Sequence, residues 1–176
     1  MGGIGSFGIN PTKVYGNTTT GPSIQEHIVG DIGWDRRGAW RFCQFGSAIT
    51  QYDAVVYGNA IGTTVNLATA QSATTALVST GPANIGIAQG TFSSGDYGWV
   101  WIGCGGGLGS GVKVRVLVSC VYGVKLYTTA TAGCLDDSVT AGLIAGLSIC
   151  VTEPGSGTAS IECQATGFIG SNLNAA

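Results

Sequence analysis

The chain has 176 residues, of which 31 are Gly, 4 are Pro, seven are basic and nine are acidic, for a net charge of −2. A disordered chain would be richer in charge, and a collagen helix would need Gly at every third position, so both classes are excluded. The basic residues are few and scattered, so no nucleic-acid partner is expected.

The balance of residue types favours strands over helices. Val, Ile and Thr together number 48, whereas the straight-chain residues that suit helices number 26. β-branched side chains fit pleated strands and lose freedom in helices. We therefore predict an all-β protein, a compact antiparallel β-barrel or sandwich of about eight or nine short strands.

The first part of the chain differs from the rest. Residues 1–38 hold six of the charged residues and the single His, and Pro11 and Pro22 interrupt any regular pattern. We predict an extended N-terminal arm over 1–38 and one β-domain over 39–176. Such an arm is expected to gain order on a partner. The expected anchors in the arm and at its root are Ile4, Phe7, Ile9, Val14, Tyr15, Trp34, Arg36, Arg37 and Trp40.

Short apolar runs bounded by turn residues follow in chain order. They predict strands over 40–45, 54–57, 63–68, 84–92, 97–102, 112–122, 125–128, 143–151 and 159–168. The run 112–122 is the longest candidate, with Val112, Val114, Val116 and Val118 facing one way by the period of two. Residues 154–157 predict the turn between the last two strands.

Two long stretches, 54–95 and 97–112, contain no charged residue. Large weakly charged surfaces are typical of interfaces, so we predict a homo-oligomer. No apolar run reaches the length of a membrane helix, so no membrane partner is expected.

Catalytic and cofactor motifs find little support. His27 is the single possible histidine base and lies in the predicted arm, where rigid geometry is hard to maintain. The glycine-rich segments 3–8 and 105–111 lack the flanking elements of nucleotide-binding loops. We predict no enzyme, no catalytic residue and no cofactor.

No metal site is predicted either. Asp136 and Asp137 form an acidic pair that suits a cation or a turn, and we favour the turn because Asp is common there. The six cysteines form no C-x-x-C pair, and one His is too few for the usual zinc patterns. We expect most of the thiols to be reduced and buried.

Two groups of aromatic residues invite more than one interpretation. Tyr97, Trp99 and Trp101 share one face of a predicted strand; a sugar platform is one interpretation, and core or oligomer interface is the favoured one. Trp34, Arg36, Arg37 and Trp40 have the residue types enriched at interface hot spots, although both Trp side chains also suit the closing of a barrel end.

Several short segments, taken together, resemble the small capsid-decoration (cement) proteins of tailed bacteriophages. They are Trp40–Phe42, Gly46–Ile49, Ala54–Val56, Ile85–Ala88, Tyr97–Val100, Leu126–Gly133 and Ala141–Gly146. The resemblance spans about residues 31–169, with the cysteines and the segment 103–111 departing from it. It implies a homotrimeric virion protein on the outer surface of the head, assembled in the host bacterial cytoplasm, whose partner is the major capsid protein. The alternative is a phage fibre or adhesin module that binds a glycan.

Overall fold

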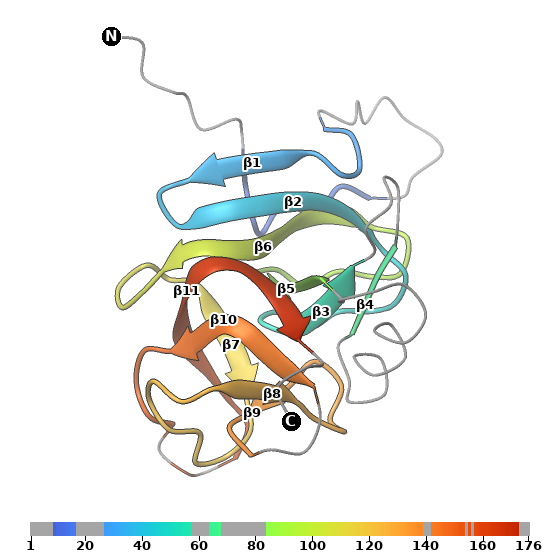
Figure 1. The fold of residues 1–176 in the computed structure, drawn as a ribbon. Helices are drawn as coiled ribbons and strands as arrows, with labels where there is room; N and C mark the ends of the chain where they lie inside the picture. The colour runs from blue at the N-terminus through green and yellow to red at the C-terminus, as the bar shows by residue number, and fades with distance from the viewer. Residues whose placement is uncertain are drawn as a thin grey trace, which may run out of the picture.

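The computed structural model describes residues 9–16, 27–57, 64–67, 84–138, 142–153, 155 and 157–172. Within these residues the chain is all-β, which confirms the predicted fold class (Figure 1). None of them forms a helix that is long and apolar enough to cross a membrane. The strands are β1 (Ile32–Asp35), β2 (Gly38–Phe45), β3 (Ala54–Tyr57), β4 (Thr64–Leu67), β5 (Asn84–Ala88), β6 (Tyr97–Gly106), β7 (Lys113–Val116), β8 (Leu126–Thr128), β9 (Leu135–Asp136), β10 (Leu143–Ile149) and β11 (Ala159–Asn172).

The strands belong to one sheet whose pairings close into two rings. The order is β1-β2-β4-β3-β5-β6-β11-β10-β8-β9-β7, with further pairings β2–β6, β5–β11 and β11–β7. A first ring therefore contains β2, β4, β3, β5 and β6, and a second contains β11, β10, β8, β9 and β7; β5 and β6 pair with β11 and so join them (Figure 1). Two pairings, β2–β4 and β7–β9, are parallel, so the sheet is mixed rather than purely antiparallel as predicted.

Alternation along the strands supplies two hydrophobic clusters, as a period of two requires. On β2, Trp40 and Phe42 point into a cluster that extends into the second ring. Ala39, Cys43 and Phe45 point into the other, which contains side chains of the first ring. Both faces of β2 are thus buried, which explains its near-continuous apolar sequence.

The predicted arm does not extend to residue 38. Ile32–Asp35 pairs with β2 in an antiparallel hairpin whose turn is Arg36-Arg37. Gly38 closes this hairpin against β6 with a φ of +126°, and a Cβ there would lie 2.4 Å from the Gly103 carbonyl oxygen. Asp31 and Arg36 of this segment are exposed, while Asp35 and Arg37 pair in the turn of an edge hairpin, and this content of charged residues is why the composition suggests an arm.

The predicted strand 112–122 is also wrong in its second half. Val112, Val114 and Val116 are buried as predicted, but Val118, expected on the same face, is 49% exposed. The strand β7 nevertheless ends at Val116, and Ser119 adopts a φ of +64° with its amide donating to Glu153 Oε2. β11, not this run, is the longest strand described.

A buried ion pair links the two rings. Arg115 on β7 donates through Nη1 to Asp53 Oδ1 at 2.6 Å, and Asp53 directly precedes β3. Arg115 also donates to Cys134 Sγ at 3.0 Å and to the Ala132 carbonyl at 3.3 Å. Burial raises the pKa of Asp53, and the Thr50 amide and the Arg115 charge offset only part of that effect. Desolvation of the Asp53 carboxylate therefore opposes the attraction within this pair.

The glycine-rich segment after β6 is held by one carboxylate. The amides of Gly109 and Gly111 donate to the two oxygens of Glu162 at 2.8 and 3.0 Å, and both glycines have positive φ. These hydrogen bonds, helped by Lys113, lower the pKa of Glu162. Glu162 thus attaches the loop between β6 and β7 to β11 through two hydrogen bonds.

The hydrogen bonds to the Glu162 carboxylate should make the stability of the fold depend on pH. A lowered folded-state pKa means that Glu162 stabilises the fold fully above its unfolded pKa, about 4.3, and loses that contribution as the pH falls through the folded value. The urea midpoint of the unmodified chain should exceed that of a Glu162→Gln variant near neutral pH, and the gap should shrink toward about pH 3. An equal gap at both pH values would show that the carboxylate charge does not hold the loop.

Candidate functional site

The predicted arm anchors divide into two groups. Ile4 and Phe7 lie outside the described residues. Ile9 and Tyr15 pack against the core of their own chain, and Tyr15 exchanges backbone hydrogen bonds with Tyr97 at 2.9 and 2.8 Å, while Val14 is exposed. The expectation that these side chains anchor an arm on a partner protein is therefore wrong for Ile9 and Tyr15, which contact their own chain.

The aromatic face of β6 is turned inward. Trp99 and Trp101 are fully buried, as is Trp40 on the neighbouring strand, and Tyr97 packs against the same cluster. The favoured core interpretation is thus correct for the tryptophans, and a sugar cannot stack on them. Their burial also accounts for the absence of charge along β6, without an oligomer interface.

The turn of the β1–β2 hairpin is fixed by Asp35. Its carboxylate accepts hydrogen bonds from the Arg37 amide and guanidinium and from Trp40 Nε1. Burial alone would raise the pKa of Asp35, but these hydrogen bonds lower it below its usual value. Arg37 is therefore held in the turn, whereas Arg36 is exposed beside it.

An exposed apolar surface lies on this hairpin and the adjacent strands. Ile32, Trp34 and Phe168, here called the hairpin patch, are 52%, 50% and 57% exposed. Four paired residues form a row across four neighbouring strands: Trp34 on β1, Ala39 on β2, Gly103 on β6 and Phe168 on β11. Because the two intervening residues are small, the rings of Trp34 and Phe168 meet above them with centroids 6.1 Å apart.

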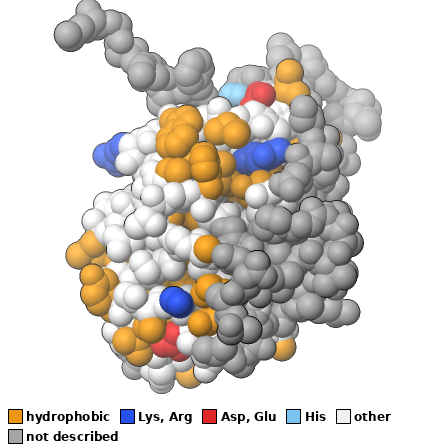
Figure 2. Space-filling model, viewed as in Figure 1, with side chains coloured by type: hydrophobic (Ala, Val, Ile, Leu, Met, Phe, Trp, Pro, Cys, Tyr) orange, Lys and Arg blue, Asp and Glu red, His pale blue; other side chains and the backbone are white. Residues whose placement is uncertain are grey.

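Basic side chains accompany the hairpin patch. Arg36 follows β1 directly, and Arg41 lies opposite Ile32 with its guanidinium above the Tyr57 ring. Figure 2 shows hydrophobic side chains gathered around β1 and β2, with basic side chains on two sides. Aromatic and Arg side chains around a desolvatable centre are the composition of interface hot spots.

A second group of exposed apolar side chains has different surroundings. It lies on the segment between β7 and β8 and beyond β10, near Asp137 and Glu153, and contains no Arg or Trp. Its members are Val118, Val121, Tyr122, Val124 and Val151. We therefore regard the hairpin patch as the better candidate for a partner surface.

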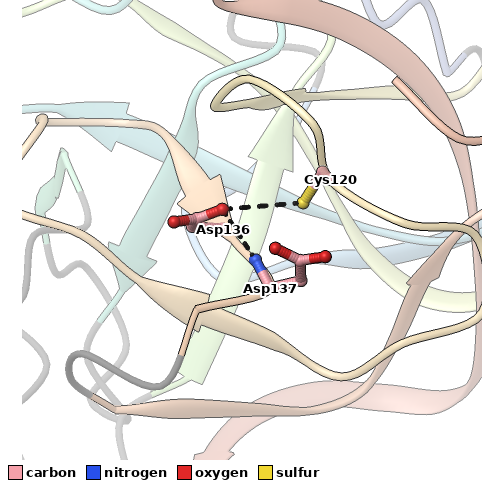
Figure 3. A group of neighbouring side chains, drawn as sticks. All are labelled: Cys120, Asp136 and Asp137. Atoms are coloured by element: carbon pink, nitrogen blue, oxygen red, sulfur yellow. Dashed lines mark hydrogen bonds between the residues drawn. The ribbon is translucent and has the colours of Figure 1, made fainter. Parts of the chain in front are cut away.

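Three possible metal ligands meet at the end of the second ring (Figure 3). Cys120 Sγ and carboxylate oxygens of Asp136 and Asp137 all lie within 4.8 Å of one another. Cys120 is fully buried, and both aspartates are partly exposed. The sequence analysis named the acidic pair but missed Cys120, because no fixed spacing in the sequence connects them.

Backbone amides orient the two carboxylates. The Val121 amide donates to Asp137 Oδ2 at 2.9 Å, and the Asp137 amide donates to Asp136 Oδ1 at 2.9 Å. Burial, together with the charges of Asp137, Asp136 and Glu153, raises the pKa of Cys120 to about 12. Neither aspartate forms an ion pair with any Lys or Arg of the described residues.

An open groove of about 370 Å³ runs along β10 near the β8 segment. Its polar lining side chains are Lys125, Ser148 and Thr166, and the remainder of the lining is apolar or Gly. Lys125 has no acidic or histidine partner in this lining, so the groove offers no acid–base pair.

No family model, curated protein or solved structure matches this chain. The resemblance to decoration proteins therefore stays a hypothesis.

Proposed function

We propose that this chain is a structural, non-enzymatic virion protein that binds the outside of a phage head and stabilises the lattice of major capsid subunits. The hairpin patch is the observation that carries the proposal, since its three large side chains stay about half exposed beside two arginines. Resemblance to decoration proteins supplies the class of partner, and the trimeric state is proposed on the same ground.

The proposed mechanism is preferential binding to the assembled shell. A protein that binds the expanded lattice better than free subunits stabilises that lattice by the difference in affinity. Because each side chain of the hairpin patch is already about half buried, its complete burial would contribute about 1–1.5 kcal/mol, and a trimer would engage several subunits at once. Arg36 would pair with capsid carboxylates or carbonyls at the margin of the contact.

We assign the capsid contact to the hairpin patch, whereas the sequence predicts it on the N-terminal arm. Ile9 and Tyr15 already cover Gly33, Trp99 and Phe42 of their own chain. Segment 9–16 thus serves the fold, and the contact is assigned to the hairpin patch.

The test is decoration of empty heads. Expanded heads, assembled from the major capsid protein of the same phage and lacking decoration, are mixed with the purified chain and sedimented. We expect saturable co-sedimentation at a fixed copy number per capsid subunit and a higher melting temperature of the heads. Absence of binding to heads, with binding on a glycan array, would replace the proposal with the adhesin alternative.

A further inference from the structure

We propose that Cys120, Asp136 and Asp137 form a binding site for a thiophilic divalent cation of the Zn²⁺ class. This site is independent of the proposed capsid function and departs from the expectation of no metal. One thiol and two carboxylates are ligands that Zn²⁺ accepts, leaving a fourth position for water.

The thiol is the observation that goes beyond a pair of acidic residues. Cys120 is fully buried, and its single hydrogen-bond partner among the described side chains is Asp136 Oδ1, at the limiting distance of 4.0 Å. Figure 3 shows its sulfur directed at the two carboxylates. The Asp137 backbone also hydrogen-bonds this sulfur, so the buried thiol is directed at the acidic pair, and a cation between the three groups would take it as a ligand.

The electrostatics and the geometry suit a cation. Two carboxylates, with Glu153 close enough to affect Cys120, provide negative charge that no described Lys or Arg neutralises by an ion pair. In a tetrahedral zinc site neighbouring ligand atoms lie about 3.3–3.6 Å apart, as follows from the metal–ligand bond lengths. Ligand atoms already within 4.8 Å of one another need to approach by at most about 1.2–1.5 Å, which side-chain rotation can supply.

The surroundings provide access and orientation. Both aspartates are partly exposed, so an ion can enter from solvent. The Val121 and Asp137 amides already bind one oxygen of each carboxylate, as outer-shell groups of metal sites do. Binding replaces the proton of the Cys120 thiol, which leaves to solvent, and forms the sulfur–metal bond.

The experiment is a Co²⁺ and Zn²⁺ titration of the full chain after treatment with a chelator and a reductant. Co²⁺ should produce a thiolate-to-metal charge-transfer band, and Zn²⁺ should displace Co²⁺ and raise the melting temperature. A Cys120→Ser variant should lose the band, while Cys150→Ser, which changes a partly exposed cysteine outside the cluster, should keep it.

A second variant keeps the test decisive if Cys120→Ser fails to fold. Asp137→Asn retains the shape of a partly exposed side chain and should weaken Zn²⁺ binding at least about tenfold, the usual cost of a lost ligand or outer-shell group. No band in the unmodified chain, a band that survives Cys120→Ser, or unchanged Zn²⁺ affinity in Asp137→Asn would each overturn the proposal.

Discussion

Replacing both Trp34 and Phe168 with alanine should lower the affinity of the chain for expanded heads by at least about a hundredfold, because truncated hot-spot residues often cost 2 kcal/mol or more each. The two rings contact each other, so their losses are not expected to add independently. The measurement is the midpoint of a co-sedimentation titration. Both side chains are about half exposed, so the thermal unfolding of the isolated chain should change little.

The matched control removes two large apolar side chains elsewhere that are at least as exposed. A Leu108→Ala, Tyr122→Ala variant changes side chains that are 75% and 59% exposed but lie outside the hairpin patch. It should bind heads like the unmodified chain. Equal loss of affinity in the two double variants would place the contact elsewhere or make it unspecific.

An Asp53→Ala substitution should lower the free energy of unfolding by about 3–5 kcal/mol, because it leaves Arg115 partly buried without its carboxylate. The Thr50 amide would lose its acceptor as well. Urea denaturation monitored by tryptophan fluorescence would measure the change.

Replacement of both partners should behave differently. Since burial raises the pKa of Asp53 despite the nearby guanidinium, the attraction does not fully offset the desolvation of the carboxylate. Burial alone would lower the pKa of Arg115, but the Cys134 hydrogen bond and the Asp53 charge raise it, so the opposing contribution comes from the carboxylate. An Asp53→Leu, Arg115→Met variant should therefore recover most of the stability lost in Asp53→Ala. If the double variant is as unstable as the single one, the loss comes from hydrogen bonds that Leu and Met cannot make, those of Asp53 with the Thr50 amide and of Arg115 with Cys134 and Ala132, rather than from an unpaired charge.

The fold was predictable where apolar side chains recur at every second residue of a strand and are buried on one face. Val112, Val114 and Val116 are buried as expected, and so are Trp99 and Trp101 of the aromatic face of β6, whereas Val118, beyond the end of β7, is exposed. β9 was missed because a strand of two residues carries no recognisable sequence pattern. It is a strand because it pairs with β7 and β8. β1 was missed because an edge hairpin carries charged residues and exposes its large side chains.

The candidate sites depended on contacts that no local pattern records. Trp34 and Phe168 meet across two strands whose opposing residues happen to be small, and nothing near either residue signals the other. Cys120 reaches Asp136 because β7 and β9 pair in parallel before the chain turns. Sequence reasoning identified Trp34 and the acidic pair, but their partners follow from the topology.

The position of β11 in the topology has a consequence for folding kinetics. β11 pairs with β10, β7, β6 and β5, and its partners include residues as distant in sequence as Asn84, which pairs with Gly170. Loops of this length are closed only at an entropic cost, so contacts of this kind are associated with slow folding. Neither the second ring nor the pairing of β11 with β5 and β6, which connects the two rings, can form until residues 159–172 have left the ribosome. Until then, the strand edges of β6 and β7 have no β11 to pair with, and exposed strand edges of that kind promote association between incomplete chains.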